Sequence, residues 1–323
     1  MRPDGGTDDS SPDPARPRSF DARYGDGVVR AVSLGGGGTW FVAWQLGYLQ
    51  RLAHHDVRVA DADRLVGTSA GSIVASTLAH GRLLSLFLES EVLSLVPGVM
   101  KVLFPASADT PSQRAALDRY LEATDAEVGT ITAIGAAARA ADTPPPETMA
   151  RDLVLVVGEH WGSDALWMTA VDTRTAERCV LTRDTGVSTA RGAAASSAVP
   201  GIFAPQPVAG RTCMDGGVSG TGVHLDLLAG AGKALVLSLY RDDELTEARL
   251  TLAPGDLTRE VAALRASGTD VLVCTPTVPP APAGADASQA VRAVMDPATA
   301  HQALHQGAAQ ADEEFELVGA FWD

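Results

Sequence analysis

The stretch LVGTSAGS, residues 65–72, decides the fold, because it places Ser69 between two glycines at the point where an apolar run stops. The pattern G-x-S-x-G at a strand-to-helix junction forms a sharp turn that lifts a serine hydroxyl above the edge of a sheet. Gly67 and Gly71 give the backbone room for that turn. In the alternative interpretation, Ser69 is only the cap of the following helix. The stretch predicts strand, turn and helix, with Ser69 as a candidate nucleophile.

The segments around this turn alternate between strand and helix patterns. The apolar run 28–34 predicts a buried strand, residues from 39 onward have helical spacing, and 63–68 and 70–80 repeat the pair. Such alternation predicts an α/β fold, a three-layer α/β/α sandwich with a mostly parallel central sheet. Further strands are expected at 152–160, 164–173, 177–183, 211–214, 234–240 and 269–276, and further helices at 186–199, 223–232, 257–268 and after Met295.

The 323 residues are expected to form one large domain with an appended leader. Residues 1–27 lack the apolar region of a secretory signal. Their high content of Pro, Asp, Ser and Gly predicts a disordered leader. Residues 28–323 form the predicted domain. Within it, 82–150 is predicted as a helical insertion or cap, closed by the proline run TPPPET, and 277–289 as a Pro/Ala-rich loop.

The composition limits the classes of partner. The net charge is −15 and only two lysines occur, which argues against nucleic acid and against electrostatic binding to an anionic membrane. No run reaches the roughly 18 apolar residues of a membrane span. Three well-separated cysteines without metal-ligand spacing predict neither a zinc site nor a disulfide framework. A cytoplasmic protein without a metal is expected.

Four consecutive glycines, GGGG at 35–38, separate the first strand from the first helix. Such a loop can leave backbone amides facing outward, as an oxyanion hole requires. The alternative is a phosphate-binding loop. However, the stretch lacks the Gly-Lys-Ser/Thr ending of a P-loop, and no G-x-G-x-x-G is completed there. The sequence therefore favours an oxyanion hole over nucleotide binding.

A third turn, DGG at 215–217, follows the short predicted strand 211–214. By itself this pattern is a common Asp-Gly turn. In combination with the other two loops, Asp215 becomes a candidate base.

The three loops in this order resemble the patatin-like phospholipase family. The stretch AWQLGYLQRL at 43–52 is similar to the helix that follows the family's glycine-rich loop, and 193–220 resembles the stretch leading into its aspartate. The resemblance implies hydrolysis of lipid esters by a Ser–Asp dyad without a cofactor, in which Ser69 is the nucleophile and Asp215 the base. It also implies an oxyanion hole, a nucleophile turn and an Asp-Gly-Gly turn, formed respectively by Gly36, Gly37, Gly38 and Thr39, by Gly67 and Gly71, and by Gly216 and Gly217.

One departure from the family pattern concerns the substrate. Trp40 stands where many members have a basic residue shortly after the glycines. The oxyanion amides need no side chain, so ester hydrolysis is still expected, while a phospholipid headgroup loses a cation that could place it. Two alternatives stay open: a lipid-binding or interaction module that does not hydrolyse, and an acyltransferase.

Histidines offer a conventional triad as an alternative, because His224, His301 and His305 come late enough in the chain. His224 is expected on a helix and directed at solvent. His301 and His305 are one helical turn apart, a spacing that can bind metal, but no third ligand is evident.

The apolar run 83–104 is expected to wall an acyl-binding trough. Its alternatives are a buried helix pair, or peripheral contact with a lipid surface by apolar insertion.

Overall fold

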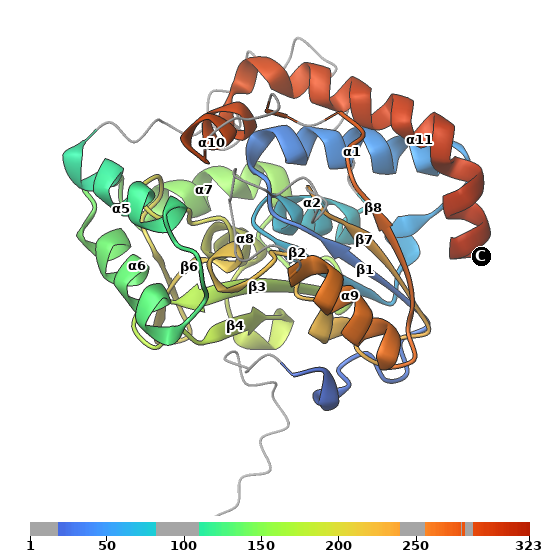
Figure 1. Ribbon diagram of the computed structural model, residues 1–323, viewed down its shortest axis with the longest axis horizontal. Helices are drawn as coiled ribbons and strands as arrows, with labels where there is room; N and C mark the ends of the chain where they lie inside the picture. Colours follow the sequence, from blue (N-terminus) through green and yellow to red (C-terminus); the bar gives the residue numbers. More distant parts are fainter. Residues whose placement is uncertain (1–18, 82–109, 240–255, 279, 282–286) are drawn as a thin grey trace, which may run out of the picture.

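The computed structural model describes residues 19–81, 110–239, 256–278, 280–281 and 287–323 (Figure 1). Residues 1–18 of the predicted leader and the apolar run 83–104 lie outside the described residues. The described part of the predicted insertion is helical and includes α5 (Pro111–Leu121) and α6 (Val128–Ala140). Within the described residues, no helix has the length and apolarity that crossing a membrane requires.

An eight-stranded sheet forms the centre of the described structure, with strand order β5-β6-β3-β2-β1-β7-β8 and β4 also paired with β3. The pairs β3–β2, β2–β1, β1–β7 and β7–β8 are parallel, and those of β4, β5 and β6 are antiparallel. The bounds are β1 Arg30–Leu34, β2 Arg64–Thr68, β3 Leu166–Asp172, β4 Arg178–Leu181, β5 Gln206–Val208, β6 Arg211–Asp215, β7 Lys233–Leu237 and β8 Asp270–Cys274. The predicted, mostly parallel α/β sheet is confirmed.

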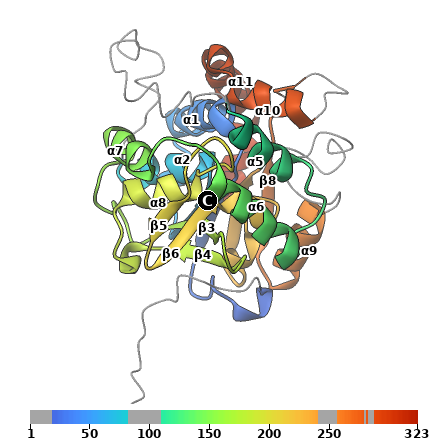
Figure 2. The same ribbon diagram turned by 90° about the vertical axis from the view of Figure 1, so that its left-hand side faces the viewer.

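Alternating side chains of the central strands enter two different cores. Val32, Leu34 and Leu65 pack in one apolar cluster with helices α1 (Gly38–His54), α2 (Ala70–Ala79) and α8 (Thr189–Ser196). Ala31 and Val66 point to the opposite face, where α9 (Asp256–Ala266) packs. Helices therefore cover both faces of the sheet, as Figure 2 shows for α1 and α2 on one side and α9 on the other.

The C-terminal helix α11 (Ala300–Trp322) packs along α1 (Figure 1). Two glycines allow this close approach, since a Cβ on Gly47 would collide with the carbonyl oxygen of Leu304 and one on Gly307 with that of Trp44. The close packing of α11 on α1 therefore depends on the absence of a side chain at both positions.

Three predicted elements were wrong. Residues 152–160 are not a strand but the end of helix α7 (Pro146–Val157) and the turn after it, because an apolar run of this length fits a buried helix face equally well. In the predicted helix 223–232, only Leu225–Leu228 forms a short 3₁₀ turn. The predicted loop 277–289 ends earlier than expected, since α10 (Ala287–Met295) begins within it.

Candidate active site

Ser69 and Asp215 are brought together because β2 and β6 end against the same edge of β3. β2 runs parallel to β3, and its last residue, Thr68, pairs with Thr169. β6 runs antiparallel, and its last residue, Asp215, pairs with Ala170, the next residue of β3. Since β4 pairs with 168–171, it occupies the other edge. The carboxyl ends of β2 and β6 therefore meet.

The turn at Ser69 is strained. Its backbone has φ 51° and ψ −121°, a conformation that costs a non-glycine residue about 1–3 kcal/mol. The flanking glycines are needed for space, since a Cβ on Gly71 would collide with the carbonyl oxygen of Leu34 and one on Gly67 would lie 2.6 Å from that of Gly71. The Ser69 side chain makes no capping hydrogen bond to α2, so the interpretation as a simple helix cap was wrong.

The carboxyl group of Asp215 is buried, and among the described residues one of its two oxygens has a hydrogen-bond partner. Its Oδ1 accepts a hydrogen bond from the Gly217 amide at 2.7 Å, and among the described residues its Oδ2 has no partner. Burial raises the pKa of Asp215 to about 6, although the nearby Ser69 hydroxyl and the Gly217 amide each lower it. The hydroxyl is close enough for this effect but forms no hydrogen bond with the carboxyl group. One carboxyl oxygen thus stays available beside the serine.

The glycine-rich loop lies against the same serine. A Cβ on Gly36 would be 3.1 Å from the Cβ of Ser69 and 3.8 Å from its Oγ. The Gly71 amide donates to the carbonyl of Gly35 at 3.1 Å, which joins the loop to the serine turn. Helix α1 begins at Gly38. Among the described residues, no hydrogen-bond acceptor is paired with the backbone amides of Gly36, Gly37 or Gly38.

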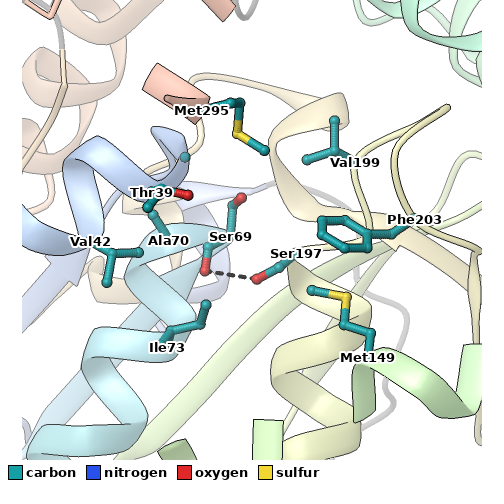
Figure 3. A pocket seen from close by; sticks show the side chains of 11 residues that line it. Thr39, Val42, Ser69, Ala70, Ile73, Met149, Ser197, Val199, Phe203 and Met295 are labelled. Carbon is teal, nitrogen blue, oxygen red and sulfur yellow. Dashed lines mark hydrogen bonds between the residues drawn. The ribbon is translucent and has the colours of Figure 1, made fainter. Parts of the chain in front are cut away.

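An apolar pocket opens at Ser69 (Figure 3). Figure 3 places Ser69 between Thr39 and Val42 on one side and Ser197 and Phe203 on the other. Gly38 also lines the pocket, together with the apolar side chains Val42, Ile73, Met149, Val199, Phe203 and Met295. Trp40 does not line it and packs in the core with 3 % exposure. The lining of the pocket beside the Ser69 hydroxyl is therefore mostly apolar.

His224 is buried, so the expectation that it faces solvent was wrong. Its Nε2 lies 3.1 Å from the carbonyl oxygen of Gly216, and its Nδ1 lies 3.2 Å from Nη1 of Arg178. Because a carbonyl only accepts and a guanidinium only donates, Nε2 carries the proton and Nδ1 accepts. The guanidinium of Arg178 also donates to both oxygens of Asp226, at 2.6 and 2.5 Å. His224 therefore supports the Asp215–Gly216 turn from behind.

The other two candidate histidines, His301 and His305, are exposed on α11 with their Nε2 atoms 3.2 Å apart. The part of the chain that the structure describes contains no group of three or more residues able to hold a metal ion.

Two serines that the sequence reasoning missed contact the turn directly. The Ser69 amide donates to Oγ of Ser196 at 3.0 Å. Oγ of Ser197 donates to the carbonyl of Ser69 at 3.0 Å, the bond drawn as a dashed line in Figure 3. Their only signal in the sequence is a serine pair at the end of a helix of small residues, which packing alone explains equally well.

One of the comparisons with known proteins identifies a family. A profile described as patatin-like phospholipase matches residues 32–226, which include all three loops. None of the curated protein sequences matches this chain. Among solved structures, the crystal structure of VipD from Legionella pneumophila is similar, with 14% sequence identity and a TM-score of 0.39 over 94% of this chain and 68% of that one.

Proposed function

Because the chain belongs to the patatin-like phospholipase family, we propose that it hydrolyses carboxylic esters of lipids with Ser69 as the nucleophile and Asp215 as the base. The family supports lipid acyl hydrolysis in general. The observation that carries the finer assignment is the buried carboxyl group of Asp215, which keeps one oxygen free beside a strained serine. Asp215 needs no third residue in this role, and the described histidines make no hydrogen bond to Ser69.

The reaction has two steps. Oγ of Ser69 attacks the ester carbonyl carbon while Oδ2 of Asp215 takes the hydroxyl proton. The tetrahedral oxyanion is stabilised by the amides of the glycine-rich loop, Gly36 to Gly38, with Thr39 next in the chain. The carbon–oxygen bond to the alcohol breaks, and Asp215 returns the proton to the leaving oxygen. Water, deprotonated by Asp215, then cleaves the acyl-serine ester and restores both residues.

The raised pKa suits Asp215 to this task. A carboxyl group with a pKa of about 6 is largely ionised at neutral pH and is a stronger base than an ordinary aspartate. The acyl chain of the substrate would lie in the apolar pocket beside Ser69, against Met149 and Phe203.

Labelling with a fluorophosphonate and hydrolysis of 4-nitrophenyl esters, from acetyl to palmitoyl, test the proposal. The wild-type protein is expected to be labelled and to hydrolyse at least part of the series, and Ser69→Ala to do neither. Ser76→Ala is the matched control, because Ser76 is a buried serine on the same helix, and among the described residues its hydroxyl bonds only to the carbonyl of Ser72. A wild-type protein that is neither labelled nor active would leave a non-hydrolytic lipid-binding module as the better interpretation.

A further inference from the structure

We propose that residues 196–198 are a positioning segment that holds the nucleophile and the base of the proposed dyad at a fixed separation. Three consecutive residues each make one hydrogen bond to Ser69 or Asp215. Ser196 accepts from the Ser69 amide, Ser197 donates to the Ser69 carbonyl, and the carbonyl of Ala198 accepts from the Asp215 amide, all at 3.0 Å. The inference rests on the proposed function and deepens it.

This segment provides a connection that the sheet lacks. β2 and β6 both pair with β3, and their ends approach each other along its edge. Ser69 leaves the strand at this point, so its own position is not fixed by ladder hydrogen bonds. Residues 196–198 are the last residue of helix α8 and the two residues after it, and Ala193, Ala194 and Ala195 of this helix are fully buried. A rigid helix end thus contacts both reacting residues.

The strained backbone of Ser69 makes such contacts necessary. A serine keeps a positive φ only where its surroundings hold the peptide groups on both sides. Here the amide and the carbonyl of Ser69 are both bound by hydroxyl groups. Removing a contact would let the turn relax and move the Ser69 hydroxyl away from Asp215.

The two serines are not equivalent. The Ser69 carbonyl accepts from Oγ of Ser197 and also from Oγ and the amide of Ser72, at 2.7 and 2.9 Å. Among the described residues, the Ser69 amide has Ser196 as its acceptor and no second one. Loss of the Ser196 hydroxyl would therefore leave a buried donor unsatisfied, whereas loss of the Ser197 hydroxyl would leave two donors in place.

The test compares Ser196→Ala and Ser197→Ala with wild type and with Ser76→Ala. Ser196→Ala is expected to lower kcat for a 4-nitrophenyl ester, and the rate constant of fluorophosphonate labelling, by about 10- to 100-fold, with KM changed by less than about twofold. Ser197→Ala is expected to lower kcat by less than about fivefold, because two donors remain. Ser76→Ala should behave as wild type. Thermal unfolding and labelling stoichiometry report the folded fraction of each variant.

A pH profile separates positioning from a merely structural role. The Ser69 hydroxyl lowers the pKa of Asp215, so displacing it should move the acid limb of kcat/KM to higher pH in Ser196→Ala. Among the described residues, the titratable groups that face Asp215 are Tyr120 of α5 and, through the Gly216 carbonyl, His224, and neither is altered. An unshifted limb, or a kcat that falls only with the folded fraction, would overturn the inference. An inactive, unlabelled wild-type protein would instead remove the proposed function itself.

Discussion

Two buried carboxyl groups lie 11 positions apart and have opposite surroundings. Asp226 is fully buried, and both of its oxygens accept from the guanidinium of Arg178. Asp215 is 3 % exposed, has no cation beside it among its hydrogen-bond partners, and keeps Oδ2 unpaired among the described residues. His224 lies between the two, with one ring nitrogen toward Arg178 and the other toward the Gly216 carbonyl.

The difference supports the proposed division of roles, in which one carboxyl group contributes only to the fold and the other takes part in the chemistry. A buried ion pair with every oxygen satisfied has no spare acceptor, and breaking it leaves a charge unpaired. A buried carboxyl group without a cation is held at a cost to stability, and in return it remains able to take a proton. The ion pair of Arg178 and Asp226, in which both carboxyl oxygens are hydrogen-bonded, lies on one side of the Asp215–Gly216 turn. The carboxyl group of Asp215, with one oxygen unpaired among the described residues, lies on the side of Ser69.

The largest expected effect is on the reactive side of this comparison. Asp215→Asn keeps the shape of the side chain but removes the base, so kcat should fall by about 10³- to 10⁴-fold. Steady-state hydrolysis of a 4-nitrophenyl ester measures the loss. Because the variant no longer buries an unpaired carboxylate, it should unfold at a temperature equal to or above that of the wild type. An Asp215→Asn protein with more than a tenth of wild-type kcat would show that another group is the base.

On the structural side, Asp226→Asn should destabilise the fold. It leaves the guanidinium of Arg178, which is 4 % exposed, without a counter-charge, and should lower the free energy of unfolding by about 3–5 kcal/mol. Urea unfolding measures this change. The double variant Arg178→Met with Asp226→Leu should recover most of the loss, because it removes both charges. If Asp226→Asn unfolds like the wild type, the two carboxyl groups are not functionally divided as proposed.

The pH dependence of stability provides a smaller effect with a defined sign. Folding raises the pKa of Asp215 from 3.8 to about 6, so the folded state binds this proton more tightly than the unfolded chain does. The resulting stabilisation is fully present below pH 3.8 and is lost as the pH rises through 6, a loss of about 3 kcal/mol. Asp215→Asn should therefore match the wild type in acid and exceed it in stability at pH 8.

As the pH falls over the same range, the stability of the wild type should rise while its activity should fall. Protonation of Asp215 removes the base, so kcat/KM of the wild type should fall below about pH 6. When unfolding and hydrolysis are measured in one buffer series, stability should level off at the pH where kcat/KM is half its plateau, about 6. If these two pH values differ widely, different groups control stability and activity.

The three loops that carry Ser69, Asp215 and the glycine run could be predicted from the sequence, because each is marked by a short local pattern. Gly67, Ser69 and Gly71 specify a turn within five residues, and an Asp-Gly-Gly turn and a glycine run are equally compact. The alternation of strand and helix patterns predicted the α/β sheet, which the structure confirms, and the order of the three loops added the family. The roles of Ser69 and Asp215 stay predictions.

The contacts of Arg178, Asp226 and His224 could not be predicted, because they join residues that are distant in the sequence. Arg178 and Asp226 are 48 positions apart, and neither has a motif around it. His224 was expected on an exposed helix, yet it has φ 46° and begins a short 3₁₀ turn that buries its ring. The strand predicted at 152–160 was wrong for a different reason, since a short apolar run has no period that separates a buried strand from a buried helix face.

The smallest expected effect concerns His224, whose ring contacts both Arg178 and the carbonyl of Gly216. His224→Gln keeps an N–H group that can donate to the Gly216 carbonyl, and the histidine contacts neither Ser69 nor Oδ2 of Asp215 by a hydrogen bond. We therefore expect kcat to fall by less than about tenfold, through a small shift of the Asp215–Gly216 turn. His301→Ala is the control, because its ring is exposed on α11, and its kcat should equal that of the wild type. A loss in His224→Gln as large as that in Asp215→Asn would mean that the proton of Ser69 travels to a histidine after all, and that Asp215 acts only by orienting it.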